Sequence, residues 1–253
     1  MNIFGAFTFG SLIKTFLPGV VWLLAFGVLE KDIAQALGYK PFILSFVQTK
    51  EQASLVLGFP TAILLGLMSN IVVFMGLNDW LVRNPVKKAQ PRLFSLYDRL
   101  ATRIRDHCWQ ELTLDDQMAR RQFDANTDVE FVILPALGPE KLAYVREQYW
   151  YHMEFQMNLF LSLLALLIGV AVNARNGATS FWELLMDIGI YLILFVPVLA
   201  LLLIAARKNY ARHMSKMLSL MAGVLCPQPE KKPDVTPRRR VAMKSSLSLK
   251  RLR

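Results

Sequence analysis

The sequence is poor in the residues that build metal centres and disulfide-stabilised domains. It contains two cysteines, Cys108 and Cys226, and three histidines, His107, His152 and His213. Two cysteines cannot form the set of bridges that stabilises many small secreted domains, and neither has a spacing typical of a metal site. We therefore expect free thiols in a reducing compartment and no bound metal.

The known catalytic motifs are also missing. The chain has no P-loop, no glycine-rich dinucleotide fingerprint, no nucleophile elbow and no HExxH motif. The three histidines are far apart in sequence, and the adjacent His107 and Cys108 would point in different directions on a helix. The sequence therefore predicts a protein that is not an enzyme and that binds no cofactor.

What the sequence does contain is long apolar runs. The hydrophobic fraction is 54% and the mean hydropathy is +0.35, which exceeds the usual composition of soluble domains. The excess lies in residues 15–29, 53–77, 155–174 and 184–206. The first run is shorter than the roughly 30 Å hydrocarbon core requires and needs the residues just before it, with Lys14 reaching to the headgroups. The pattern predicts an all-α polytopic membrane protein with four transmembrane helices.

The distribution of lysine and arginine predicts the orientation of these spans. Eleven Lys/Arg residues lie in 78–154 and thirteen in 207–253, whereas 30–52 holds three and 175–183 holds one. Positively charged segments remain on the cytoplasmic side. We therefore predict an inner-membrane protein with residues 1–29 as the N-terminus and first span, and with both termini in the cytoplasm. The loops 30–52 and 175–183 are expected outside.

The cytoplasmic segment 78–154 is predicted to be small and mostly helical. It begins with the loop-like sequence RNPVKKAQPR, and 93–111 then has the apolar spacing of an amphipathic helix. A capping-box pattern at Thr113 and Asp116 predicts a short helix to about residue 123. The run VEFVILP, 129–135, is expected to be a strand or extended segment. From Pro139 nothing interrupts the helical pattern, so one helix should run from the cytoplasm through the third span to residue 174.

A stripe of polar and small residues follows one face of this long helix. Its members recur every three or four positions, and those that we single out as candidates are Glu154, Asn158, Ser162 and Gly169. The second span repeats the pattern with Gly66 and Asn70. Small residues at this spacing allow close helix packing, and polar groups in hydrocarbon require partners. Two interpretations stay open, namely packing within one chain, or a subunit interface or pore lining.

The fourth span carries an acid about one turn inside its outer boundary. Asp187 lies four residues before Tyr191, and both are candidate interface or pore-lining residues. A lipid-facing carboxylate there is unfavourable, so Asp187 should pair with Arg175 or another subunit, unless the membrane begins beyond it. No ionisable residue lies at mid-depth in any span, which argues against a proton-coupled carrier.

The C-terminal segment is strongly basic. Residues 207–226 are expected to form an amphipathic helix that either extends the fourth span or lies on the inner leaflet. Residues 227–253 are expected to be disordered. Candidate contacts to anionic lipid headgroups are Arg207, Lys208, Arg238, Arg239 and Arg240. Nucleic acid is the less favoured partner, because no aromatic residue is interleaved with these charges.

Two functions follow from this layout. The first is an oligomeric channel or pore, gated through the cytoplasmic region, with several copies of the chain forming the path. The number and order of spans are similar to those of flagellar stator subunits and connexin-type large-pore channels, and a bacterial defence effector that breaches its own membrane would fit as well. The second is a membrane-anchored scaffold that recruits a cytosolic protein to the inner leaflet. A small dimeric carrier ranks third.

Overall fold

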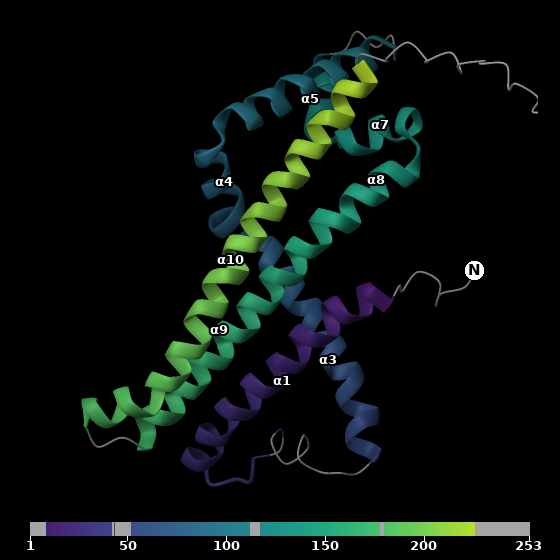
Figure 1. Cartoon of the computed structure of the whole chain (residues 1–253). Helices are drawn as coiled ribbons and strands as arrows, with labels where there is room; N and C mark the ends of the chain where they lie inside the picture. The colour runs from purple at the N-terminus through teal and green to yellow at the C-terminus, as the bar shows by residue number, and fades with distance from the viewer. Residues whose placement is uncertain (1–8, 42, 44–51, 112–116, 178–179, 226–253) are drawn as a thin grey trace, which may run out of the picture.

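The computed structural model describes residues 9–41, 43, 52–111, 117–177 and 180–225, and within this part of the chain every regular element is helical. Figure 1 shows a lower group of helices and an upper group joined by two long ones. The elements in order are α1 (Phe9–Leu37), α3 (Gln52–Val72), η2 (Val73–Leu77), η3 (Asp79–Arg83), α4 (Asn84–Ala89), α5 (Pro91–Glu111), α6 (Gln117–Asn126), α7 (Val129–Leu137), α8 (Pro139–Val145), η4 (Arg146–Trp150), α9 (Tyr151–Gly177) and α10 (Phe181–Leu225).

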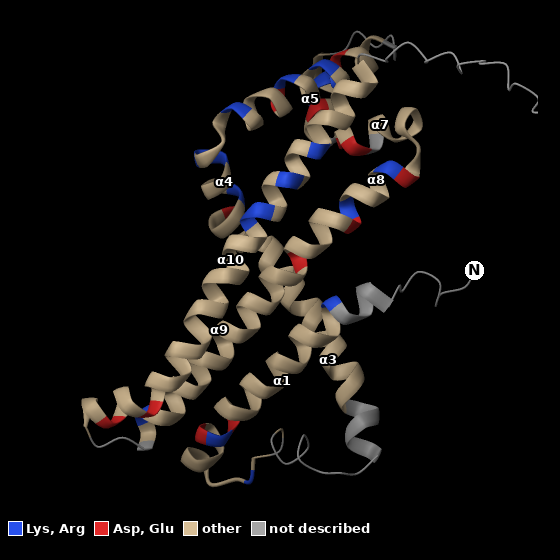
Figure 2. Ribbon diagram, viewed as in Figure 1, with Lys and Arg blue, Asp and Glu red and all other residues tan. Residues whose placement is uncertain are grey.

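Three helices of the described chain are long and apolar enough to cross a bilayer, which is compatible with a membrane protein. They cover Gly58–Leu77, Pro139–Asn176 and Phe181–Leu225. In Figure 2 the middle stretches of α9 and α10 are free of charged residues, a few charges lie at their lower ends, and lysine and arginine gather on the upper elements. The predicted helix from Pro139 into the third span is confirmed as a continuous run of 38 residues, in which η4 forms a local π-helical turn.

The lower group is built around α9. Helix α1 packs against both α3 and α9, and α10 packs along α9. Helix α1 contains the first predicted span and runs on to Leu37, so residues 30–37 are helical where we expected a loop. Ala34, which follows the charged residues Glu30, Lys31 and Asp32, is again buried, so the end of α1 still packs against its neighbours.

The second span ends in a sharp change of direction at Gly76. Its φ is 153°, a backbone conformation that glycine adopts without the steric strain of a side chain. The kink lies within the π-helical turn η2, and η3 and then α4 follow it. The prediction of a loop for RNPVKKAQPR was wrong at every position except Gln90, because Pro85 occupies the first turn of α4 and Pro91 begins α5, and proline is tolerated in the first turn of a helix.

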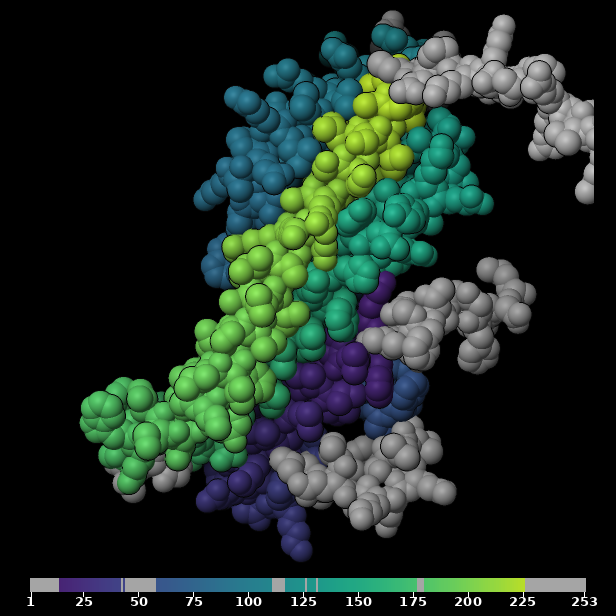
Figure 3. Space-filling model, in the orientation of Figure 1, coloured from purple at the N-terminus to yellow at the C-terminus, as the bar shows by residue number. Residues whose placement is uncertain are grey.

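Helix α10 is one continuous element of 45 residues. Figure 3 shows it crossing the whole face of the molecule, with α4 and α5 on one side of its upper half and α7 and α8 on the other. The predicted amphipathic helix 207–226 is the upper part of α10 through Leu225. It extends the fourth span and does not lie flat as a separate element.

The upper group forms a helical domain around this extension of α10. One cluster of its apolar side chains joins α10 to η2, α4, α5 and α9, and the other joins it to α5, α7, α8 and η4. The side chains that α10 contributes are Ala206, Tyr210, Met214, Met217 and Met221. The domain and the membrane helices therefore share packed side chains, because α9 and α10 belong to both.

The segment 129–135 is helical, as part of α7, and the prediction of a strand was wrong. Short apolar runs fit either structure, and local contacts decide between them. The Asp128 side chain accepts a hydrogen bond from the Glu130 backbone N–H and caps the helix. Val129 and Ile133 then fall on one helical face and are both buried. Helix α5 agrees with its predicted range, while Thr113 and Asp116 lie outside the described residues.

Candidate functional site

Polar side chains of α3 and α9 hydrogen-bond to one another between the membrane helices. Ser69 Oγ donates to Asn158 Oδ1 at 3.1 Å, and Asn158 Nδ2 donates to Asn70 Oδ1 at 2.9 Å. Ser69 and Asn158 are each only 3% exposed. A buried asparagine in an apolar surrounding requires such partners. The candidates Asn158 and Asn70 are therefore brought together within one chain, which favours the packing interpretation of the stripe.

Ser162 lies one turn further along the stripe and is fully buried. Its hydroxyl donates to the Leu159 backbone carbonyl at 3.0 Å, the short-range bond by which serine satisfies itself within a helix. Neither this hydroxyl nor the Asn158 amide faces outward, so within the described chain the centre of the stripe offers no polar path.

Small residues set the distance between α1 and its neighbours. A Cβ built on Gly66 would collide with the backbone carbonyl of Thr15, and one on Gly19 would collide with that of Ala62. On α9, a Cβ on Gly169 would lie 3.3 Å from Leu29 Cγ. The candidates Gly66 and Gly169 therefore permit close backbone contact to α1. The same pairs show that α1 runs antiparallel to α3.

Aromatic and charged side chains gather where α9 leaves the membrane. Trp150 Nε1 donates to Glu154 Oε1 at 2.5 Å, and the Lys14 ammonium lies 3.9 Å from the centroid of the Tyr151 ring. The Trp150 ring also packs beside Phe74. Trp150 thus joins the spans to the domain through internal contacts, and Glu154 is held on the same turn as this tryptophan.

Asp187 and Tyr191 line a cavity of about 400 Å³ at the opposite end of the membrane helices. Helix α9 contributes Asn173 and α1 contributes Val28 to its walls. Asp187 is exposed, and among the described residues it forms no ion pair, so pairing with Arg175 is not observed.

The domain contains a buried charged network that the sequence did not indicate. Arg146 Nη2 donates to Glu130 Oε2 at 2.7 Å, and His213 Nε2 lies 3.7 Å from Glu130 Oε1. Burial raises the pKa of Glu130, but His213 and Arg146 lower it by more, so the pKa of this carboxyl lies below its usual range. The network links α7, η4 and α10, which are distant in sequence.

The basic residues predicted to contact lipid divide into two groups. Arg207 Nε donates to the Leu81 backbone carbonyl at 2.8 Å, so this guanidinium joins α10 to η3. Lys208 is the next residue of α10 and is exposed. Arg238, Arg239 and Arg240 lie outside the described residues, and their contact with lipid stays a prediction.

The described residues contain no group of three metal-ligating side chains that could hold an ion. Comparison with protein-family models, with curated proteins and with solved structures gives no match. The functional argument therefore rests on the geometry of this chain alone.

Sequence reasoning missed two single residues and one ion pair among these contacts. Ser69 could have been found, because it precedes Asn70 on a helix whose small residues already indicated an interface. Gly19 lies five residues beyond Lys14, and only its position against Ala62 reveals its role. The Glu130–Arg146 pair had no sequence signal, because the chain between the two residues folds back at Gly138.

Proposed function

We propose that the chain crosses the membrane four times, with α1 as the additional span beside the three apolar helices. The support is its packing: α1 lies against α3 and α9 over the same stretch that the sequence marks as apolar. Its ends carry charge, with Lys14 near Tyr151 at one end and Glu30 to Asp32 at the other. A helix with an apolar middle and charged ends fits a bilayer of about 30 Å.

The proposed orientation places the helical domain in the cytoplasm. Lysine and arginine concentrate on α4, α5 and the upper half of α10 (Figure 2), which is the distribution that retains a segment inside. Cysteine labelling of intact cells tests this. A cysteine at Ser95 should react only after the cells are opened, whereas one at Tyr39 should react before. Labelling of Ser95→Cys from outside would refute the orientation.

Within this topology, we propose that the protein is a membrane-anchored platform that presents its domain to a cytosolic partner at the inner leaflet. The observation that carries this proposal is that the domain core is built on the extensions of two spans, α9 and α10. Such packing holds the domain in a fixed orientation to the bilayer. The polar residues of the spans are meanwhile bonded to each other, so a single chain has no evident path for a solute.

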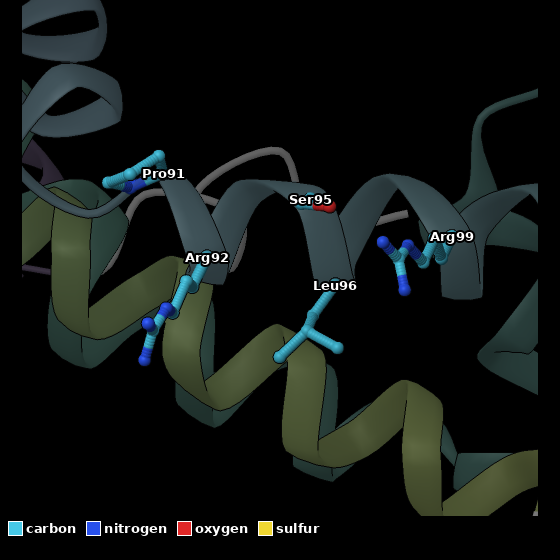
Figure 4. A pocket seen from close by; sticks show the side chains of 5 residues that line it. All are labelled: Pro91, Arg92, Ser95, Leu96 and Arg99. Atoms are coloured by element: carbon cyan, nitrogen blue, oxygen red, sulfur yellow. The ribbon is translucent and has the colours of Figure 1, made fainter.

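The outer surface of α5 is the part of the domain best suited to a partner. Figure 4 shows Arg92, Leu96 and Arg99 extending from one side of this helix. Together with Pro91 and Ser95 they line a pocket of about 410 Å³. Leu96 is an exposed apolar residue between two cations. This combination fits an acidic segment that also offers an apolar side chain.

Photocrosslinking in cells tests the platform. A photoreactive amino acid in place of Leu96 should yield a discrete protein adduct. The Leu96 side chain is exposed, so a Leu96→Glu variant should still fold. The same probe at Met186, which is exposed at the far end of α10, should give no cytosolic adduct. Equal adducts at both positions, or none at Leu96, would count against a partner on α5.

A second candidate is the oligomeric channel gated through the cytoplasmic region. It is favoured by the span of α10, which is buried over only a small part of its surface and carries Asp187 at its outer end. Several copies could place this surface around an axis. Purified protein in liposomes separates the two functions, because a platform adds no conductance to that of protein-free membranes. Conductance that Asp187→Asn alters would support the channel.

A further inference from the structure

A basic cavity lies where the second and fourth spans leave the proposed membrane. It has a volume of about 630 Å³ and is bounded by η3, α4 and the first cytoplasmic turn of α10. Its charged lining consists of Lys87, Lys88 and Arg207, and no acidic residue lines it. The nearest acid along the chain, Asp79, is paired with Arg83 at 3.5 Å. Among the described residues, none of the three lining cations forms an ion pair.

The cavity is a structured site, because Arg207 is fixed in it. The guanidinium is half-buried and uses Nε to bond the Leu81 carbonyl, and among the described residues its two terminal amino groups make no other hydrogen bond. A fixed arginine with free donors is the usual partner of a phosphate, and lysines add charge around it. Lys87 and Lys88 come from the last turn of α4 and line the same cavity as Arg207 of α10.

The surroundings of the cavity distinguish a lipid from a soluble ligand. The apolar span ends at Leu77, and Trp80 on the cavity wall is 70% exposed. Met75, in the last turn of the second apolar span, is 82% exposed. On α10 the apolar run gives way to charge at Arg207 itself. A headgroup in the cavity would thus have acyl chains beside Met75 and an aromatic ring at the interface, where tryptophan is favoured.

We propose that this cavity binds the phosphate of an anionic phospholipid headgroup from the inner leaflet. The ligand chemistry is a phosphate held by Arg207, Lys87 and Lys88, with Trp80 and Asn84 at its side. The inference rests on the proposed membrane topology. The inference adds a specific lipid-binding site to the proposed membrane platform. The basic C-terminal residues would add further contacts to anionic lipid.

The test uses the full chain purified in mild detergent and analysed for bound lipid by native mass spectrometry. Phosphatidylglycerol and phosphatidylcholine are offered at equal concentration. The wild type should retain phosphatidylglycerol preferentially. Each cation near the surface contributes about a fivefold gain in affinity, so Lys87→Gln with Lys88→Gln should weaken retention by up to about 30-fold. Both lysines are exposed, so folding should be preserved.

The matched control is Lys141→Gln with Lys216→Gln. It also removes two exposed lysines from the domain, but at the groove between α8 and α10 and away from the cavity. Retention of phosphatidylglycerol should be unchanged in this control. Equal loss in both double variants would overturn the proposal, because it would show attraction by net charge alone.

Two further measurements identify the source of the phosphate and protect the interpretation. Displacement of the bound lipid by millimolar inorganic phosphate, together with no preference between the two lipids, would overturn the lipid assignment in favour of a soluble phosphate. Carbonate extraction of membranes containing each variant reports insertion independently. A wild-type chain that resists extraction and yet shows no preference for phosphatidylglycerol refutes this site, whereas extraction of the wild type refutes the membrane topology.

Discussion

Replacing Gly66 by alanine tests the close contact between α1 and α3 directly. The new methyl group would occupy the position of the Thr15 backbone carbonyl, which belongs to a helix and cannot rotate away as a side chain can. The two helices must therefore separate. Overpacking of this kind costs about 1–3 kcal/mol, and a backbone obstacle places the expected cost toward the upper end, at about 2–3 kcal/mol.

The control for this change is Gly189→Ala on α10. No atom lies within 4 Å of a Cβ built there, so the substitution meets open space. Alanine is the better helix former by up to about 1 kcal/mol, so this variant should be as stable as the wild type or more stable. The two substitutions are identical in chemistry and both lie in apolar helices, so their difference isolates the packing term.

The assay is thermal denaturation of the purified protein in one detergent at a fixed scan rate. A loss of 2–3 kcal/mol in a chain of this size lowers Tm by about 4–12 °C. Gly66→Ala should melt in that range below the wild type, and Gly189→Ala should not. A Gly66→Ala protein that melts with the wild type would show that α1 does not pack on α3 as described, and would remove the main support for α1 as the fourth span.

Three further outcomes are expected. Asn158→Ala leaves Ser69 and Asn70 without their shared partner and should destabilise the protein by about 1–2 kcal/mol. The stability losses of Asn158→Ala and Asn70→Ala should not add in the double variant, and full additivity would contradict the network. Met217→Ala creates a cavity at a side chain only 1% exposed and should cost about 2–5 kcal/mol, whereas Met118→Ala, at 72% exposure, should be neutral in the same melting assay. Because the pKa of Glu130 is lowered in the fold, its stabilising contribution is present above the ordinary value of 4.5 and is lost as pH falls through the lower folded value. The pH at which the protein unfolds in acid, followed by tryptophan fluorescence, should therefore differ between Glu130→Gln and the wild type. Identical acid unfolding curves would refute the pairing of Glu130 with Arg146 and His213.

The membrane character, the helical fold and the long helix from Pro139 were predictable because they depend on local composition. Apolar length is a property of consecutive residues, and the structure agrees with it over α3, α9 and α10, although Pro60 and Pro197 lie inside two of these helices. Helix α7 was not predictable in this way, because the short and mostly apolar run 129–135 fits a strand or a helix. The cap at Asp128 and the burial of Val129 and Ile133 against distant elements decide it.

The candidate site was predictable to the extent that it lies on helical faces. The stripe through Asn158 and Ser162 and the small face through Gly66 were evident from spacing alone. That these two faces meet each other depends on how α3 and α9 are placed in three dimensions, which spacing does not contain. The phosphate cavity shows the same limit, because Lys87 and Arg207 are 120 positions apart and meet only through the kink at Gly76.

Because α10 is one continuous helix, a tilt of its apolar part also moves its upper end. A rod of 45 residues is about 68 Å long, and its upper 19 residues extend about 28 Å beyond the apolar part. A change of about 5° in its tilt, of the kind that follows bilayer thinning, would swing the tip by roughly 2–3 Å. Because α5, α7 and α8 are packed on this upper part of α10, they would travel with it, and in the proposed topology a change in membrane thickness would displace the whole domain.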